Sequence, residues 1–133
     1  MLVVETIIEI AGFPEKHVEE TMQKVLDKLK AEKGINVIKK NLSIVKQVKQ
    51  LWCTFVELDL KIKDLQTLMG FCFDYMPTSV QIIEPEDFKT ESKQMSNSIN
   101  DLLAKLHNFQ MFISNLNAEN MLLKSKLNIK EED

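Results

Sequence analysis

Apolar and polar residues alternate over residues 2–10, at the start of the chain. One face of this stretch consists of Val4, Thr6, Ile8 and Ile10, and the other consists of Val3, Glu5, Ile7 and Glu9. A period of two, combined with many β-branched side chains, is typical of a strand with one buried face. The pattern therefore predicts a strand over 2–10.

The period then changes from two to that of a helix. The next apolar residues recur at intervals of three and four, at Val18, Met22, Val25, Leu26 and Leu29. Pro14 stands where a helix tolerates proline, near its first turn, and Gly34 stands where helices commonly end. We expect one amphipathic helix between Pro14 and Gly34.

Two further strands and a second helix follow from the same reasoning. Residues 35–46 and 51–62 are apolar stretches, the second clearly alternating, and we expect them to be joined near Lys46–Gln50. Asp64 is placed to cap a helix that Pro77 would end. The helix has apolar residues at Leu65, Leu68, Met69, Cys72, Phe73 and Met76.

A short final strand over Ser79–Ile83 completes the order strand, helix, strand, strand, helix, strand. This order resembles the split-βαβ, ferredoxin-like plan, a four-stranded antiparallel sheet with two helices on one face. The predicted fold class is therefore α+β, with a ferredoxin-like βαββαβ domain at residues 1–85. Such a widely used plan implies no particular activity.

After Pro85 the pattern becomes a heptad repeat with no further proline or glycine. The predicted a positions are Ser92, Ile99, Leu106, Ile113, Asn120 and Leu127, and the d positions are Phe88, Met95, Leu102, Phe109, Leu116 and Leu123. A helix from about 88 to 130 would be ~65 Å long. We expect residues 86–130 to form a coiled-coil helix, followed by an acidic tail at 131–133.

The heptads predict self-association through one apolar seam. The seam residues are Met95, Ile99, Leu102, Leu106, Phe109, Ile113, Leu116, Asn120, Leu123 and Leu127. Isoleucine at a, leucine at d and a single asparagine at a favour a parallel homodimer. The apolar stripe is wide, however, because it includes Leu103, Met111, Phe112, Met121 and Leu122, so a trimer, a tetramer or a helical protein partner also fits. The alternative is a long helix that folds back over its own sheet.

Composition indicates a compact domain and argues against nucleic acid as a partner. The chain has 133 residues, of which 44% are hydrophobic and 28% charged, as expected for one compact domain with an extension. All 17 basic residues are lysines, and the net charge is −3. Because arginine supplies most bidentate contacts to guanine and phosphate, nucleic acid is an unlikely partner.

The two cysteines and the start of the chain bear on location. Cys53 and Cys72 lie inside apolar stretches, which is typical of reduced cysteines, with a disulfide as the lesser alternative. The first residues have no basic region of the kind that precedes a secretion signal, and no apolar run approaches ~20 residues. We expect a cytoplasmic protein with no membrane association.

Candidate chemistry is sparse. Four carboxylates on the two strands that the ferredoxin-like plan places at its centre could approach one another and bind a cation: Glu5, Glu9, Glu57 and Asp59. Lys39 and Lys61 are placed to offset them, so a charged, solvated sheet face is the stronger interpretation and we expect no metal. Neither histidine has a ligand partner at helical spacing, and motifs for nucleophilic catalysis or phosphate binding are absent.

These observations favour a function without catalysis or cofactors. The leading hypothesis is an oligomerisation or protein-interaction module that presents small α+β domains on a coiled coil. The second is a ligand-sensing regulatory domain of the ferredoxin-like kind, for an amino acid or a metal. A nucleic-acid-binding dimer is a weaker third hypothesis, because arginine is absent and aromatic residues outside the heptads are few.

Overall fold

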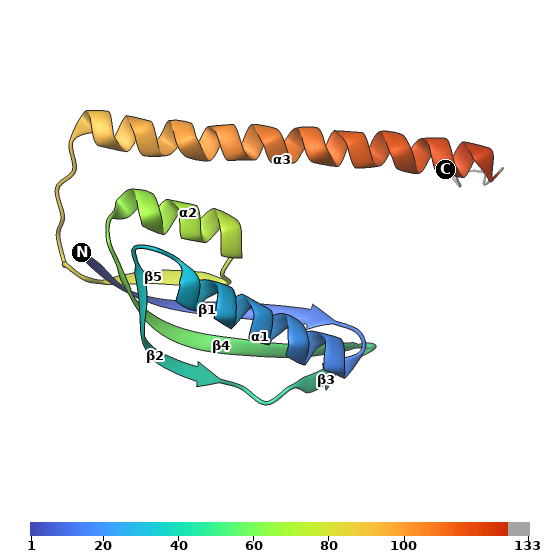
Figure 1. Cartoon of the computed structure of the whole chain (residues 1–133), viewed down its shortest axis with the longest axis horizontal. Helices are drawn as coiled ribbons and strands as arrows, with labels where there is room; N and C mark the ends of the chain where they lie inside the picture. The colour runs from blue at the N-terminus through green and yellow to red at the C-terminus, as the bar shows by residue number, and fades with distance from the viewer. Residues whose placement is uncertain (128–133) are drawn as a thin grey trace. The chain divides into compact units, whose positions relative to one another are not determined.

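A computed structural model describes residues 1–127 of the chain and has an α+β architecture (Figure 1). Within these residues the strands are β1 (Leu2–Gly12), β2 (Ile35–Leu42), β3 (Lys46–Val48), β4 (Leu51–Ile62) and β5 (Ser79–Glu84). The helices are α1 (Glu15–Ala31), α2 (Leu65–Tyr75) and α3 (Ser92–Lys126). The predicted class, α+β with a long C-terminal helix, is confirmed.

The chain divides into two compact units, Met1–Ser98 and Ile99–Asp133. The first contains the whole sheet, both shorter helices and the first two turns of α3. In the second, the described residues belong to α3 and to the turn that follows it. The predicted tail at 131–133 and the predicted end of the helix at 128–130 lie outside the described residues.

All five strands belong to one antiparallel sheet, in the order β2-β4-β1-β5, with β3 paired to β4. β1 and β4 lie side by side along the whole of β1, from the pair Leu2–Ile62 to the pair Gly12–Trp52. Because residues on neighbouring strands pair directly, the odd-numbered residues of β1 and β4 share one face and the even-numbered residues share the other.

The even-numbered face carries the core. Its side chains from the two central strands are almost fully buried, among them Val4, Ile8, Val56, Leu58, Leu60 and Ile62. They form one cluster with Met22, Leu26 and Leu29 of α1 and with Leu68 and Phe71 of α2. Both shorter helices therefore cover the same face of the sheet, and the odd-numbered face is free of helices in the first unit.

The prediction of four strands is wrong by one. Residues 43–45 leave the sheet, and Lys46–Val48 then form the short strand β3 against the start of β4. The reason is local hydrogen bonding: Ser43 accepts a bond from the backbone N–H of Phe55 (3.0 Å) and lies 3.3 Å from the Thr54 hydroxyl. These bonds hold the chain against β4 where β2 ends. The strand predicted over 35–46 therefore ends at Leu42, and β3 forms largely within the connection predicted near Lys46–Gln50.

The predicted start of the long helix near residue 88 is also wrong. Residues 85–91 are not helical, and α3 begins at Ser92, with the Met95 N–H donating to the Glu91 carbonyl (3.0 Å). Phe88 instead borders a hollow of the first unit together with Leu2, Leu65 and Pro85. Its predicted place at a d position of the heptads is therefore lost.

Within residues 1–127, no helix combines the length and the apolar character that crossing a membrane requires.

Candidate interaction surface on helix α3

Most residues of helix α3 are exposed, and its first turns belong to the first unit. Ser98 is 3% exposed and is the only buried residue of Ser92–Lys126. Its hydroxyl donates to the carbonyl of Gln94 (3.1 Å), a bond that satisfies a buried polar group within the helix itself. Beyond Ser98 the helix continues for 28 residues that pack into no core within the second unit.

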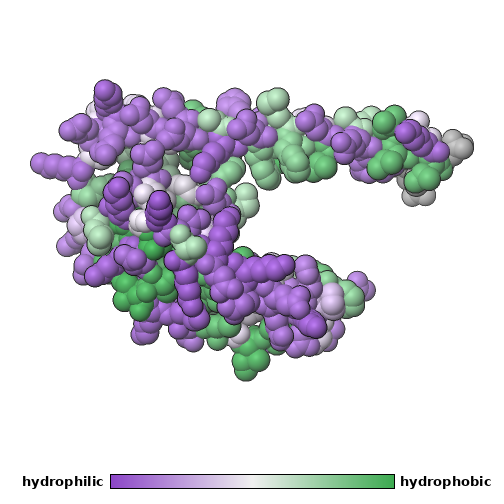
Figure 2. Space-filling view, viewed as in Figure 1, coloured by the Kyte–Doolittle hydropathy of each residue, from purple (hydrophilic) through white to green (hydrophobic). Residues whose placement is uncertain are grey.

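The predicted seam lies along this exposed helix. Apart from Met95 and Leu102, its apolar members are between 41% and 68% exposed. They are Ile99, Leu106, Phe109, Ile113, Leu116, Leu123 and Leu127. Met95 and Leu102 are half-buried, and Asn120 is exposed. Figure 2 shows hydrophobic side chains gathered on the C-terminal half of α3. A single chain thus leaves a continuous apolar surface in water, which soluble monomers rarely do.

The apolar surface extends beyond the seam. Leu103, Met111, Phe112, Met121 and Leu122 lie outside the a and d positions and are between 45% and 65% exposed. A strict two-helix seam would need only a and d. The additional width enlarges the area that a neighbouring helix can cover.

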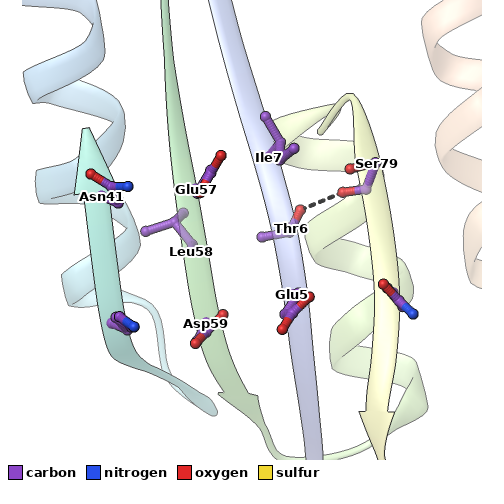
Figure 3. A pocket seen from close by; sticks show the side chains of 10 residues that line it. Glu5, Thr6, Ile7, Asn41, Glu57, Leu58, Asp59 and Ser79 are labelled. Atoms are coloured by element: carbon purple, nitrogen blue, oxygen red, sulfur yellow. Dashed lines mark hydrogen bonds between the residues drawn. The ribbon is translucent and has the colours of Figure 1, made fainter. Parts of the chain in front are cut away.

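The four candidate carboxylates lie on the helix-free face of the sheet, but the structure brings only three of them together. Glu5 is directly opposite Asp59, and Glu57 is opposite Ile7. Glu5, Ile7, Glu57 and Asp59 line a hollow of about 440 Å³ on that face (Figure 3). Glu9 is opposite Phe55 and does not line it.

The remaining lining of the hollow is mixed in charge and polarity. Asp59 also faces Lys39 of β2, which supplies a positive charge, and amides and a hydroxyl complete the wall at Asn41, Gln81 and Ser79. Among residues 1–127, no group of three or more His, Cys, Asp or Glu side chains is placed to hold a metal ion. The sequence pattern did not identify Asn41, Ser79 or Gln81, because their positions depend on how β2 and β5 pair with the centre.

Three ionisable groups of the first unit have pKa values shifted by their local surroundings. Asp64 caps α2 as predicted: it accepts bonds from the Thr67 hydroxyl (2.6 Å) and the Thr67 N–H (2.8 Å), and these lower the pKa of its carboxyl. Burial raises the pKa of the Cys72 thiol, which makes it a weaker nucleophile. Cys53 and Cys72 are both free.

Tyr75 joins the two shorter helices. Its hydroxyl donates to the Glu32 carboxylate (3.0 Å) at the end of α1, and its ring stacks on Phe71 at a centroid distance of 5.1 Å. Burial, and then this hydrogen bond, raise the pKa of Tyr75. The contacts hold α2 against the end of α1, which is a structural role.

The sequence pattern does not identify one group of exposed apolar residues. Phe13, Ile44, Val48 and Leu51 are between 48% and 81% exposed, at or next to the β3 end of the sheet. The signal was present in the chain, since Ile44 and Val48 stand between lysines near a turn. The pattern places Ile44 inside the strand predicted over 35–46 and Val48 in the connection predicted near Lys46–Gln50, so it does not bring the two residues together at one end of the sheet.

The fold and the exposed helix together define the class of protein: a small α+β domain that carries a long amphipathic helix with no core of its own. The chain belongs to the MJ0538 family, whose model matches residues 3–131. The match therefore covers both the sheet unit and the long helix. Comparisons with curated proteins and with solved structures found no match.

Proposed function

We propose that the protein is a non-enzymatic interaction module that self-associates through the seam of α3 as a coiled coil and presents its α+β unit. The observation that supports the proposal is the exposed seam from Ile99 to Leu127. Burying a leucine or isoleucine stabilises an assembly by about 1.5–3 kcal/mol when the side chain starts fully exposed. Half-exposed seam residues contribute roughly half of that each, so several together would support an oligomer.

The mechanism we propose is presentation. Two or more sheet units tethered by one coil meet each other, or a shared target, at an effective concentration set by the tether rather than by the bulk solution. This needs no catalytic group. It agrees with a first unit whose Cys72, Asp64 and Tyr75 have structural surroundings.

We also propose that the first unit follows the ferredoxin-like plan. The strand order β2-β4-β1-β5, antiparallel throughout, supports this, as do two helices that share one core with the same face of the sheet. Relative to that plan, β3 is an additional strand. It pairs with the start of β4, on the edge of β4 that β2 occupies further along.

One observation favours a second candidate function, a ligand-sensing regulatory domain. The hollow on the helix-free face holds carboxylates, a lysine and amides within one concave surface, a mixture that suits a small zwitterion such as an amino acid. All of its charged side chains are at least partly exposed, however, so the hollow offers a weakly desolvated site. We rank this function below the interaction module.

The test of the proposed function is the mass of the full chain in solution and its loss on seam disruption. The variant Ile113→Asp with Leu116→Asp places two charges in the seam, and Ser114→Asp places one on the opposite side of the same helix. Light scattering should give an oligomer for the parent and for Ser114→Asp, and a monomer with an unchanged circular dichroism signal from the sheet for the double variant. A monomeric parent chain would refute the proposal.

A further inference from the structure

The C-terminal half of α3 contains two features that together specify a partner. The first is Asn120, a polar residue at an a position between the apolar layers of Leu116 and Leu123. The second is the pair of charges beside it, Glu119 at a g position and Lys124 at the following e position. Between Ile113 and Leu123, Glu119 is the only charged residue of the helix.

Asn120 discriminates between the two orientations of a helix pair. In a parallel, in-register pair each a residue faces the same residue of the other chain, so Asn120 meets Asn120 and the two amides hydrogen-bond. In an antiparallel pair an a residue faces a d residue. The d residues of α3 are Met95, Leu102, Phe109, Leu116 and Leu123, all apolar, so the Asn120 amide would be buried without a partner.

The charges are compatible with a parallel pair and identify the residue, Lys124, whose role differs between the two orientations. In a parallel pair a g residue of one helix lies beside the e residue five positions later in the other helix. Glu119 of each chain would then face Lys124 of the other, so one dimer gains two attractive pairs. In antiparallel pairs g faces g and e faces e, so Glu119 and Lys124 never face each other, and Glu119 can instead face Lys105, another g residue. Of the two arrangements, only the parallel pair therefore places Lys124 opposite Glu119.

We propose that the seam is covered by a second copy of α3, parallel and in register, and that Glu119 and Lys124 are the residues that specify this pairing. The inference rests on the proposed function, because it assumes that the seam is an interface. It adds the identity and orientation of the partner and two residues outside the seam that determine them.

The experiment is a charge exchange in the full-length chain. Glu119→Lys alone places lysine opposite lysine twice in a parallel dimer, and Lys124→Glu alone places glutamate opposite glutamate twice. A mixture of the two variants restores two attractive pairs in every heterodimer. Glu86→Lys and Lys93→Glu make the same charge changes at exposed positions away from the a, d, e and g positions, and serve as matched controls.

We expect each single variant to need about tenfold more protein than the parent to assemble, which corresponds to about 1.4 kcal/mol. The equimolar mixture should assemble as well as the parent does, and 1 M salt should remove most of these differences, because it screens charges beyond about 3 Å. The control variants should behave as the parent. Sedimentation or light scattering over a concentration series measures all of these quantities, and native mass spectrometry identifies the heterodimer in the mixture.

The outcomes separate the two proposals. If the parent assembles but Lys124→Glu assembles equally well, the parallel assignment is wrong, and the Ile113→Asp, Leu116→Asp double variant decides separately whether the seam is the interface. The same holds if the mixture is no better than its components. A parent chain that is monomeric at all concentrations would overturn both the proposed function and this inference.

Discussion

The Tyr75 hydroxyl donates a hydrogen bond of 3.0 Å to the carboxylate of Glu32, 43 residues earlier in the chain. Tyr75 ends α2, and Glu32 follows the last residue of α1, so the bond joins the ends of the two helices that cover the sheet. Lys28 also lies over the Tyr75 ring, 5.3 Å from its centroid. Each of these contacts depends on the sheet that places α1 beside α2.

This relationship makes the first prediction. Tyr75→Phe keeps the ring and its stacking on Phe71 but removes the hydrogen bond, so the free energy of unfolding should fall by about 0.5–1.5 kcal/mol at pH 7. Because the folded state raises the pKa of Tyr75, the stability that it gains from this residue is present below the ordinary tyrosine pKa and declines at higher pH. Urea unfolding of parent and variant should therefore converge above about pH 10. Equal stabilities at pH 7 would show that the bond contributes nothing.

The second prediction concerns the cap of α2. Asp64→Ala removes the acceptor for the Thr67 N–H and hydroxyl and should reduce the free energy of unfolding by about 0.5–2 kcal/mol. Because the folded state lowers the pKa of Asp64, its contribution is present above the ordinary aspartate pKa and is lost as pH falls through the lowered value. The control is Asp64→Asn, which retains an acceptor but cannot titrate. Its stability should therefore depend less on pH in the acid range than that of the parent.

The third prediction is that the sheet unit folds without the exposed helix. Residues 1–98 contain the complete core and the buried Ser98, so a chain ending at Ser98 should unfold cooperatively and be monomeric. Light scattering and thermal unfolding monitored by circular dichroism provide the measurements. If this shorter chain had the same oligomeric state as the full chain, the sheet rather than α3 would be the interface.

The fourth prediction is the effect of removing the polar residue from the seam. Asn120→Ile should raise the melting temperature of the oligomer, because a buried polar pair at an a position costs stability. It should also broaden the distribution of masses or orientations, because misaligned partners no longer leave an amide unpaired. A large fall in melting temperature at unchanged mass would indicate a different role for Asn120.

The fifth prediction addresses the hollow on the helix-free face. Divalent cations, amino acids and nucleotides should leave the unfolding transition of the full chain nearly unmoved. A ligand that bound only the folded state at 100 times its dissociation constant would add about 2.7 kcal/mol, which a thermal scan detects readily. A saturable shift that Glu57→Gln abolishes would instead support the ligand-sensing function.

Local periodicity determined much of this structure. Alternation in residues 2–10 placed Val4 and Ile8 on the buried face and Glu5 and Glu9 on the exposed one, as the structure confirms. The Asp64 cap followed from side-chain chemistry within one turn of helix. The long helix and its apolar stripe followed from the heptads. These features depend on residues at most a few positions apart, so a single sequence contains them.

The tertiary structure decided what depends on pairing between distant segments. The break at residues 43–45 and the strand β3 arise from bonds between Ser43 and β4, 11 and 12 residues further along the chain. The hollow required the register of β2 and β5 against the centre of the sheet, which brings Lys39 and Gln81 to Glu5 and Asp59 and leaves Glu9 out. No local pattern encodes such a register, because strand pairing is selected by how all the side chains of the core pack at once.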